Sequence, residues 1–167
     1  MSKSESDLKA AFAGESQANR RYLAFAKKAE EEGFPQIAKL FRAVAEAETV
    51  HALTHFKTMG GIGSTAENLK VAIAGENYEV NTMYPDFMAD AEAEGDKKAF
   101  SSFHKAYEVE KIHEELYKDA LTALEDGVEM AENEYYVCPV CGYTHVGTPP
   151  DKCPVCGASK ERFNKVS

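Results

Sequence analysis

The sequence contains one motif written twice, and this duplication constrains the fold more than any other feature. Each copy reads Ala-x-Ala-Gly-Glu and then, further along, Glu-x-Glu-x-x-His. The copies occupy residues 11–51 and 72–113. A four-helix bundle can surround a pair of metal ions with carboxylates and imidazoles from all four helices. The duplication therefore predicts an all-α four-helix bundle that binds two metal ions.

Apolar residues at helical spacing predict four long helices, over about 5–32, 35–60, 64–94 and 97–132. Pro35 suits a first helical position, and Ser64 followed by Glu67 predicts a capping box. Pro85 is expected to kink or interrupt the third helix. The link between the second and third helices is short for crossing a bundle from end to end. Either the third helix begins late or helix pairs exchange between two chains.

Seven residues are candidate metal ligands. Residues three apart share one face of a helix, so each copy can direct its Glu-x-x-His pair into the same interior. The candidates are Glu15, Glu48, His51, Glu76, Glu79, Glu110 and His113. Five carboxylates and two imidazoles form a donor set that iron favours. Glu79 aligns with Ala18 of the first copy, so we expect the two halves of the site to differ.

Two tyrosines lie close to the ligand faces. Tyr22 follows Glu15 by seven residues, and Tyr84 follows Glu76 by eight. Each tyrosine is therefore a candidate hydrogen-bond partner for a ligand carboxylate. Aromatic packing in the core is an equally good explanation of both residues.

The charge of the chain excludes several classes of partner. A net charge of −9 and a pI near 5.1 disfavour nucleic acids and anionic membranes. The sequence has no apolar run near the ~20 residues that span a bilayer, and its N-terminus lacks a signal-peptide pattern. We therefore expect a cytoplasmic protein whose partners are proteins or small molecules.

The four cysteines form two C-P-x-C-G units near the C-terminus: Cys138, Cys141, Cys153 and Cys156. In a reducing compartment this spacing predicts a tetrahedral four-thiolate metal site rather than two disulfides. Zinc ribbons use similar spacing, so the residues leave iron and zinc open. Zinc would make the site structural, whereas iron would make it a one-electron carrier. We place the domain boundary between residues 1–133 and 134–167.

Together these motifs resemble the rubrerythrin family over nearly the whole chain. The resemblance rests on the seven candidate ligands, on the stretch from Gly75 to Pro85 and on the terminal cysteine pairs. It implies a ferritin-like di-iron bundle followed by a rubredoxin-like domain with one iron. It also implies that Glu48 and Glu110 bridge the irons, that Glu15 binds one iron, and that Glu76 and His113 bind the other. Glu79 and His51 would exchange as ligands with oxidation state.

The resemblance implies a non-haem peroxidase that reduces hydrogen peroxide to water in oxidative-stress defence. Electrons would reach the di-iron site through the rubredoxin-like iron, from a protein donor such as rubredoxin or a reductase. The family also implies a homodimer, in some cases with exchanged helix pairs. Two alternatives stay open: an iron-oxidising protein that reacts mainly with dioxygen, and a helical interaction module with a structural zinc ribbon.

Overall fold

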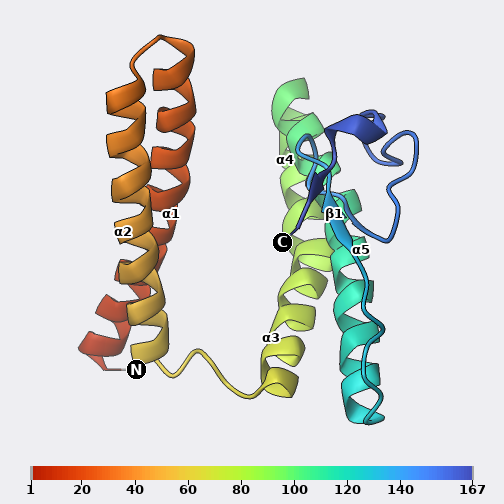
Figure 1. Ribbon diagram of the computed structural model, residues 1–167. Coiled ribbons are helices and arrows are strands. Elements are labelled where there is room, and N and C mark those ends of the chain that lie inside the picture. Colours follow the sequence, from red (N-terminus) through yellow and green to blue (C-terminus); the bar gives the residue numbers. More distant parts are fainter. Residues whose placement is uncertain (1, 167) are drawn as a thin grey trace. The chain divides into compact units, whose positions relative to one another are not determined.

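The computed structural model describes residues 2–166, which divide between Gly63 and Ser64 into two compact units. The first unit is an antiparallel hairpin of α1 (Lys3–Glu31) and α2 (Pro35–Thr58) (Figure 1). The second unit contains a helical hairpin and the cysteine-rich tail. Each unit contains one copy of the duplicated motif.

The first hairpin packs along a seam of small residues. Ala38, Ala45 and Ala52 recur every seven residues on α2 and are at most 6% exposed, and Ala26 and Ala29 of α1 are also buried. Alanine allows two helix backbones to approach closely, and the seven-residue spacing keeps the seam on one face. Outside the seam, larger apolar side chains such as Leu40 (63% exposed) stay uncovered within this hairpin. The hairpin therefore has an apolar surface left for another hairpin.

The second hairpin has an interrupted first arm. α3 (Thr65–Tyr78) continues directly into a π-helical turn, η1 (Glu79–Met83), and then into α4 (Tyr84–Glu94). The return arm is α5 (Lys97–Glu125). Ser64 and Glu67 form the predicted capping box, and the chain turns at Gly95 with a φ of 71°. The interruption predicted at Pro85 occurs as the π turn that immediately precedes α4.

The tail is a small sheet of three short strands in the order β2-β1-β3. β1 (Tyr135–Val137) pairs antiparallel with β2 (Thr144–Val146) and with β3 (Asn164–Lys165). A 3₁₀ turn, η2 (Lys160–Arg162), precedes β3. Strand β2 lies against α5 of the same unit.

One helix boundary differs clearly from the prediction. The last long helix was expected to reach residue 132, but α5 ends at Glu125. Gly127 follows with a φ of 66°, a left-handed conformation that ends helices and that glycine adopts readily. None of the helices within residues 2–166 is long and apolar enough to cross a membrane.

Candidate metal centres

The first hairpin brings Glu15, Glu48 and His51 together. One ligand atom from each residue lies within 4.8 Å of the other two. Nδ1 of His51 is 2.9 Å from Oε2 of Glu48. The Glu48 side chain is only 15% exposed, whereas the His51 side chain is 56% exposed. This half-site therefore has a sheltered carboxylate and an imidazole that reaches towards solvent.

The second hairpin brings together the equivalent residues Glu76, Glu110 and His113, again within 4.8 Å. Burial and the neighbouring Glu110 carboxylate raise the pKa of Glu76 to about 7. Burial and the same neighbour also raise the pKa of Glu79. Glu79 therefore lies beside this triad, although it is not one of its three close members. Crowded carboxylates of this kind need a cation to be ionised together, which is the chemistry of a metal site.

The tail holds the imidazole of His113 in place. Nδ1 of His113 is 2.6 Å from Oε2 of Glu110, and Nε2 is 2.9 Å from Oγ1 of Thr144. The Thr144 hydroxyl donates to the Gly142 carbonyl, so its oxygen accepts a hydrogen bond from Nε2–H. A contact this short between Nδ1 and a carboxylate oxygen needs a proton between them, and this hydrogen bond with Glu110 raises the pKa of His113 above its usual value. A bound metal would take the place of that proton at Nδ1, while Nε2–H would go on donating to Thr144. The sequence analysis missed Thr144, because nothing in the sequence links strand β2 to α5.

The π turn occurs where the two copies differ in length. Glu15 and Glu76 are 61 residues apart, whereas Tyr22 and Tyr84 are 62 residues apart. The second copy therefore has one extra residue between its glutamate and its tyrosine. A π turn accommodates one additional residue within a helix, and η1 spans Glu79–Met83 in this interval. The extra residue changes the helix geometry at Glu79, the candidate ligand that the first copy lacks.

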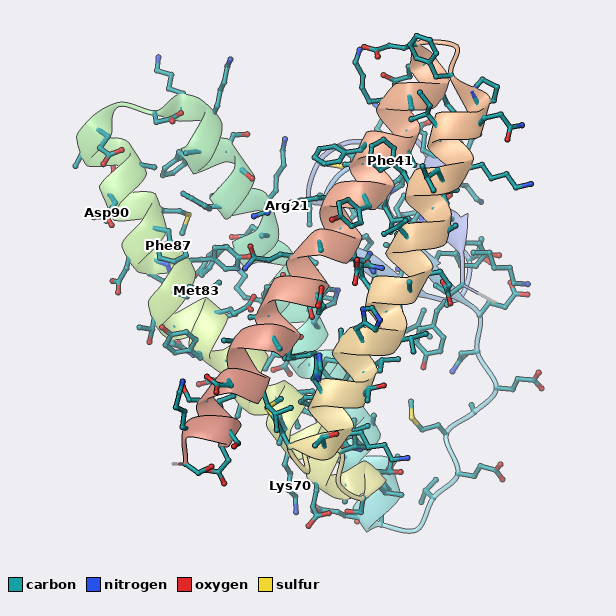
Figure 2. All side chains as sticks on the ribbon, turned by 90° about the vertical axis from the view of Figure 1, so that its left-hand side faces the viewer. Arg21, Phe41, Lys70, Met83, Phe87 and Asp90 are labelled. Atoms are coloured by element: carbon teal, nitrogen blue, oxygen red, sulfur yellow. The ribbon has the colours of Figure 1, made fainter. Side chains whose placement is uncertain are left out.

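Beyond this interval the copies are in register. Tyr22, Phe25 and Phe41 form an aromatic cluster with ring centroids 5.6–6.3 Å apart. The residues 62 positions later form the same cluster, with centroids 5.5–6.4 Å apart: Tyr84, Phe87 and Phe103. Phe41 and Phe87, one from each cluster, are labelled in Figure 2. Both tyrosines are half-buried and pack against these phenylalanines. Burial first, and then the carboxylates of Glu79, Glu110 and Glu76, raise the pKa of Tyr84.

One contact in each hairpin ties its two arms together next to the ligands. In the first, the Asn19 amide donates to the Ala45 carbonyl at 2.7 Å and to the Thr49 hydroxyl at 2.8 Å. In the second, Asn77 donates to Glu114 at 2.9 Å. Asn77 directly follows Glu76, and Glu114 directly follows His113. Neither contact repeats in the other copy, so the duplication gave no signal for them.

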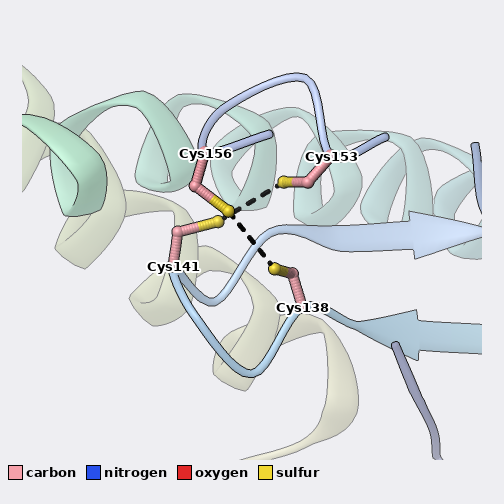
Figure 3. Close-up of side chains that lie close together, drawn as sticks. All are labelled: Cys138, Cys141, Cys153 and Cys156. Atoms are coloured by element: carbon pink, nitrogen blue, oxygen red, sulfur yellow. Dashed lines mark hydrogen bonds between the residues drawn. The ribbon is translucent and has the colours of Figure 1, made fainter. Parts of the chain in front are cut away.

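The four cysteine sulfurs converge on one point between the two turns of the tail (Figure 3). Sγ of Cys138 is 3.5 Å from Sγ of Cys156, and Sγ of Cys141 is 3.5 Å from Sγ of Cys153. A disulfide would need about 2 Å, whereas a metal–sulfur bond of about 2.3 Å gives sulfurs roughly 3.8 Å apart in a tetrahedron. The separation therefore fits a tetrathiolate metal site.

The surrounding residues favour ionisation of one of these thiols, that of Cys138. Burial opposes the charge on Cys138, but N–H groups of Val140 and Cys141 outweigh it and lower the pKa of the Cys138 thiol to about 7. Burial raises the pKa of Cys141 and of Cys156. Four thiolates this close need a bound cation, so metal binding must release protons.

The predicted residues thus fall into three groups: one Glu-Glu-His triad in each hairpin, and the four cysteines. These groups fit a di-iron site and a rubredoxin-type metal site by the chemistry of their donors. The assignment of individual residues as ligands stays a prediction.

Comparison with known proteins matches two parts of the chain. Residues 7–121 match the rubrerythrin family, and residues 136–164 match the rubredoxin-like domain of rubrerythrin. The chain is 41% identical to rubrerythrin of Porphyromonas gingivalis, covering 99% of this chain and 90% of that protein. It is 37% identical to rubrerythrin-2 of Clostridium acetobutylicum, covering 93% and 92%.

Among solved structures, the chain is similar to fully reduced, all-ferrous nigerythrin, with a TM-score of 0.60 and 34% identity. The alignment covers 99% of this chain and 88% of that one. These matches confirm the expected fold class, a four-helix bundle followed by a small cysteine-rich rubredoxin-like domain. The chain therefore belongs to the rubrerythrin family, whose members are generally di-iron oxidoreductases.

Proposed function

We propose that this protein is a non-haem di-iron peroxidase that reduces hydrogen peroxide to water in defence against oxidative stress. The observation that carries the proposal is the 2.9 Å contact between His113 and Thr144. Thr144 lies three residues after Cys141 in the tail, and His113 belongs to a Glu-Glu-His triad. The tetrathiolate site and the carboxylate site are thereby joined through a few bonds, which suits a relay of single electrons.

The triad of Glu15, Glu48 and His51 and the triad of Glu76, Glu110 and His113 would together hold the pair of irons, with Glu79 beside the second triad. The bound irons would supply the electrons, and peroxide takes two electrons and two protons to become two waters. The carboxylates balance the charge of the metals, and the Thr144 hydroxyl keeps Nδ1 of His113 turned towards them. With iron, Cys138, Cys141, Cys153 and Cys156 would form the one-electron site that refills the centre.

The assembled centre requires both hairpins, and we propose that it forms in a homodimer that exchanges them. The link between α2 and α3 comprises residues 59–64, because α3 begins at Thr65 and not later. Six extended residues reach at most about 22 Å, whereas α2, with its 24 residues, is about 36 Å long. A ferritin-like bundle needs a crossing of its full length between these helices, and exchange removes that requirement.

Rapid mixing tests the reaction. Iron-loaded protein, reduced without oxygen, is mixed with one equivalent of hydrogen peroxide or dioxygen while the ferric-thiolate colour is followed. We expect fast oxidation by peroxide and slow oxidation by dioxygen. The opposite preference would favour an iron-oxidising protein, and absence of thiolate colour in protein isolated from cells would favour a structural zinc site.

The relay has its own test. Replacing Cys141 with serine should leave the reduced bundle able to react once with peroxide but unable to be re-reduced efficiently. Single-turnover and steady-state rates, measured on the same preparation, separate the two steps. Steady-state turnover at the wild-type rate in Cys141→Ser would show that electrons bypass the tail.

A further inference from the structure

An open groove of about 670 Å³ lies beside the tetrathiolate site, between the first three turns of α5 and the first cysteine turn of the tail. Its α5 side carries Lys97, Lys98 and Lys105, and its tail side carries Val140 and Cys141. Both sides belong to the same compact unit. The groove therefore places three cations next to one of the four thiolates.

These cations are unusual in a chain with a net charge of −9. Within residues 2–166 none of the three lysines forms an ion pair with a side-chain carboxylate. Lys97 and Lys98 also occupy the first turn of α5, where the helix dipole is already positive and basic side chains are unfavourable. The first turns of α1 and α3 carry glutamates instead. The groove is therefore positive at some cost to helix stability.

The groove also gives an approach to the metal site. Cys138 and Cys153 are buried, at 0% and 3% exposed, whereas Cys141 is only half-buried and lines the groove. Val140, next to it, is 40% exposed. An apolar contact surrounded by charges is the usual form of a transient protein interface, where the charges steer the approach and the contact is released easily.

We propose that this groove is the docking surface for an acidic electron-donor protein, which reduces the tetrathiolate iron through Cys141. The proposal rests on the function proposed above. One electron leaves the donor's reduced centre and converts ferric to ferrous iron, with no bond made or broken. Lys97 and Lys105 are eight residues apart, about 12 Å along the helix, so the charges are spread as for a protein surface rather than gathered around one phosphate.

The test compares Lys97→Glu/Lys98→Glu with a matched control, Lys27→Glu/Lys39→Glu. The control lysines are also exposed and form no ion pair with any side-chain carboxylate of residues 2–166, but they lie on α1 and α2. The docking variant should fold, because glutamates suit the first turn of a helix. The donor is flavodoxin hydroquinone, an acidic one-electron carrier whose spectrum differs from that of the ferric tetrathiolate. Rapid mixing measures the rate at which flavodoxin hydroquinone reduces the iron-loaded, oxidised protein.

We expect the docking variant to be reduced about tenfold more slowly at low ionic strength, with the difference shrinking as salt is added. The control should change less than about twofold, because it alters only the net charge. Reduction by methyl viologen radical, a small cation, should not slow in either variant. Lys105→Glu alone should also lower the rate of reduction by flavodoxin.

Three results would overturn the proposal. If flavodoxin reduces wild type and docking variant at equal rates, the groove is not used. If methyl viologen radical also reduces the docking variant more slowly than wild type, the metal site is damaged. Direct reduction of wild type by NADH, weakened in the docking variant, would make the groove a nucleotide site. Peroxide oxidation of the pre-reduced variant is measured separately, so failure of the peroxidase function is distinguishable from failure of docking.

Discussion

His51 and His113 occupy equivalent positions in the two hairpins, but their imidazoles are held differently. Both place Nδ1 within 3 Å of a glutamate of the same helix, at 2.9 Å and 2.6 Å. Nε2 of His113 is fixed by Thr144, whereas Nε2 of His51 has no hydrogen-bond partner within residues 2–166. The tail thus makes one copy of a duplicated site rigid and leaves the other able to turn. Two halves with the same residue pattern are thus made unequal by a contact that only one of them has.

The largest effect is expected when a different half-site is disabled in each of the two chains of a dimer. Glu48→Ala and Glu110→Ala should each lose the di-iron centre, because each removes a carboxylate from one triad. Co-expressed and purified as a mixed dimer, the two variants should recover one intact centre if hairpins exchange, since the two undamaged hairpins then meet. Iron content and peroxidase activity measure the recovery. A mixed dimer with only the tetrathiolate iron would place both half-sites of each centre in one chain.

The π turn can be removed to make the copies more alike. Deleting Thr82 should return the second copy to the seven-residue spacing of Glu15 and Tyr22 and convert η1 to regular α-helix. We expect retained helix content but a loss of about 10–100-fold in peroxide reactivity, because Glu79, the first residue of the π turn, changes its position relative to Glu110. Circular dichroism and rapid mixing measure the two effects. Undiminished reactivity would mean that the turn has no part in the site.

The hydrogen bonds of Asn19 and Asn77, which join the two arms of each hairpin, are expected to differ less in their effect on stability. Asn19→Ala removes two buried hydrogen bonds and should lower the free energy of unfolding of the metal-free protein by about 1–2 kcal/mol. Asn77→Ala should have a smaller effect, because Glu114 keeps its contact with Lys118 at 2.9 Å. Urea denaturation of both variants makes the comparison. An equal or larger loss for Asn77→Ala would show that the Lys118 contact does not compensate Glu114 for the lost hydrogen bond.

The smallest expected effect is a pH dependence of the second hairpin. The pKa of Glu76 is raised to about 7 in the folded protein, so the folded state holds a proton that the unfolded chain has already released. Stability of the metal-free protein should therefore fall as pH rises from about 4.5 to 7. Glu76→Gln cannot ionise, so its melting temperature should match wild type near pH 4.5 and exceed it by a few degrees near pH 8. A constant difference across this range would exclude the ionisation of Glu76 as the cause.

Much of this fold was readable from the sequence because the signals were local. Ser64 and Glu67 predicted the start of α3, Pro35 predicted the start of α2, and the repeated Glu-x-x-His pairs predicted the triads. The early end of α5 had a signal in Gly127 that apolar periodicity outweighed. The π turn was present only as a one-residue difference between the offsets of the two copies.

The remaining features depend on contacts between distant residues. Thr144 contacts His113 from a position 31 residues away, and the groove beside Cys141 needs α5 and the tail together. Helical periodicity identifies which side of a helix is buried but does not identify its neighbour. Nothing in the sequence alone therefore marks the lysines of α5 as part of a groove.

The extra residue of η1 also affects how this chain can evolve. Similar repeats within one gene tend to exchange sequence, which keeps them alike. Here a segment copied from the first repeat into the second would arrive one residue short and would carry the alanine of position 18 in place of Glu79. The regular helix that it restores would keep Tyr84 and Phe87 on their face, because the π turn takes up only the added residue. Such an exchange would therefore preserve the fold and remove one candidate ligand, so selection against it is expected to act on the metal chemistry and not on folding.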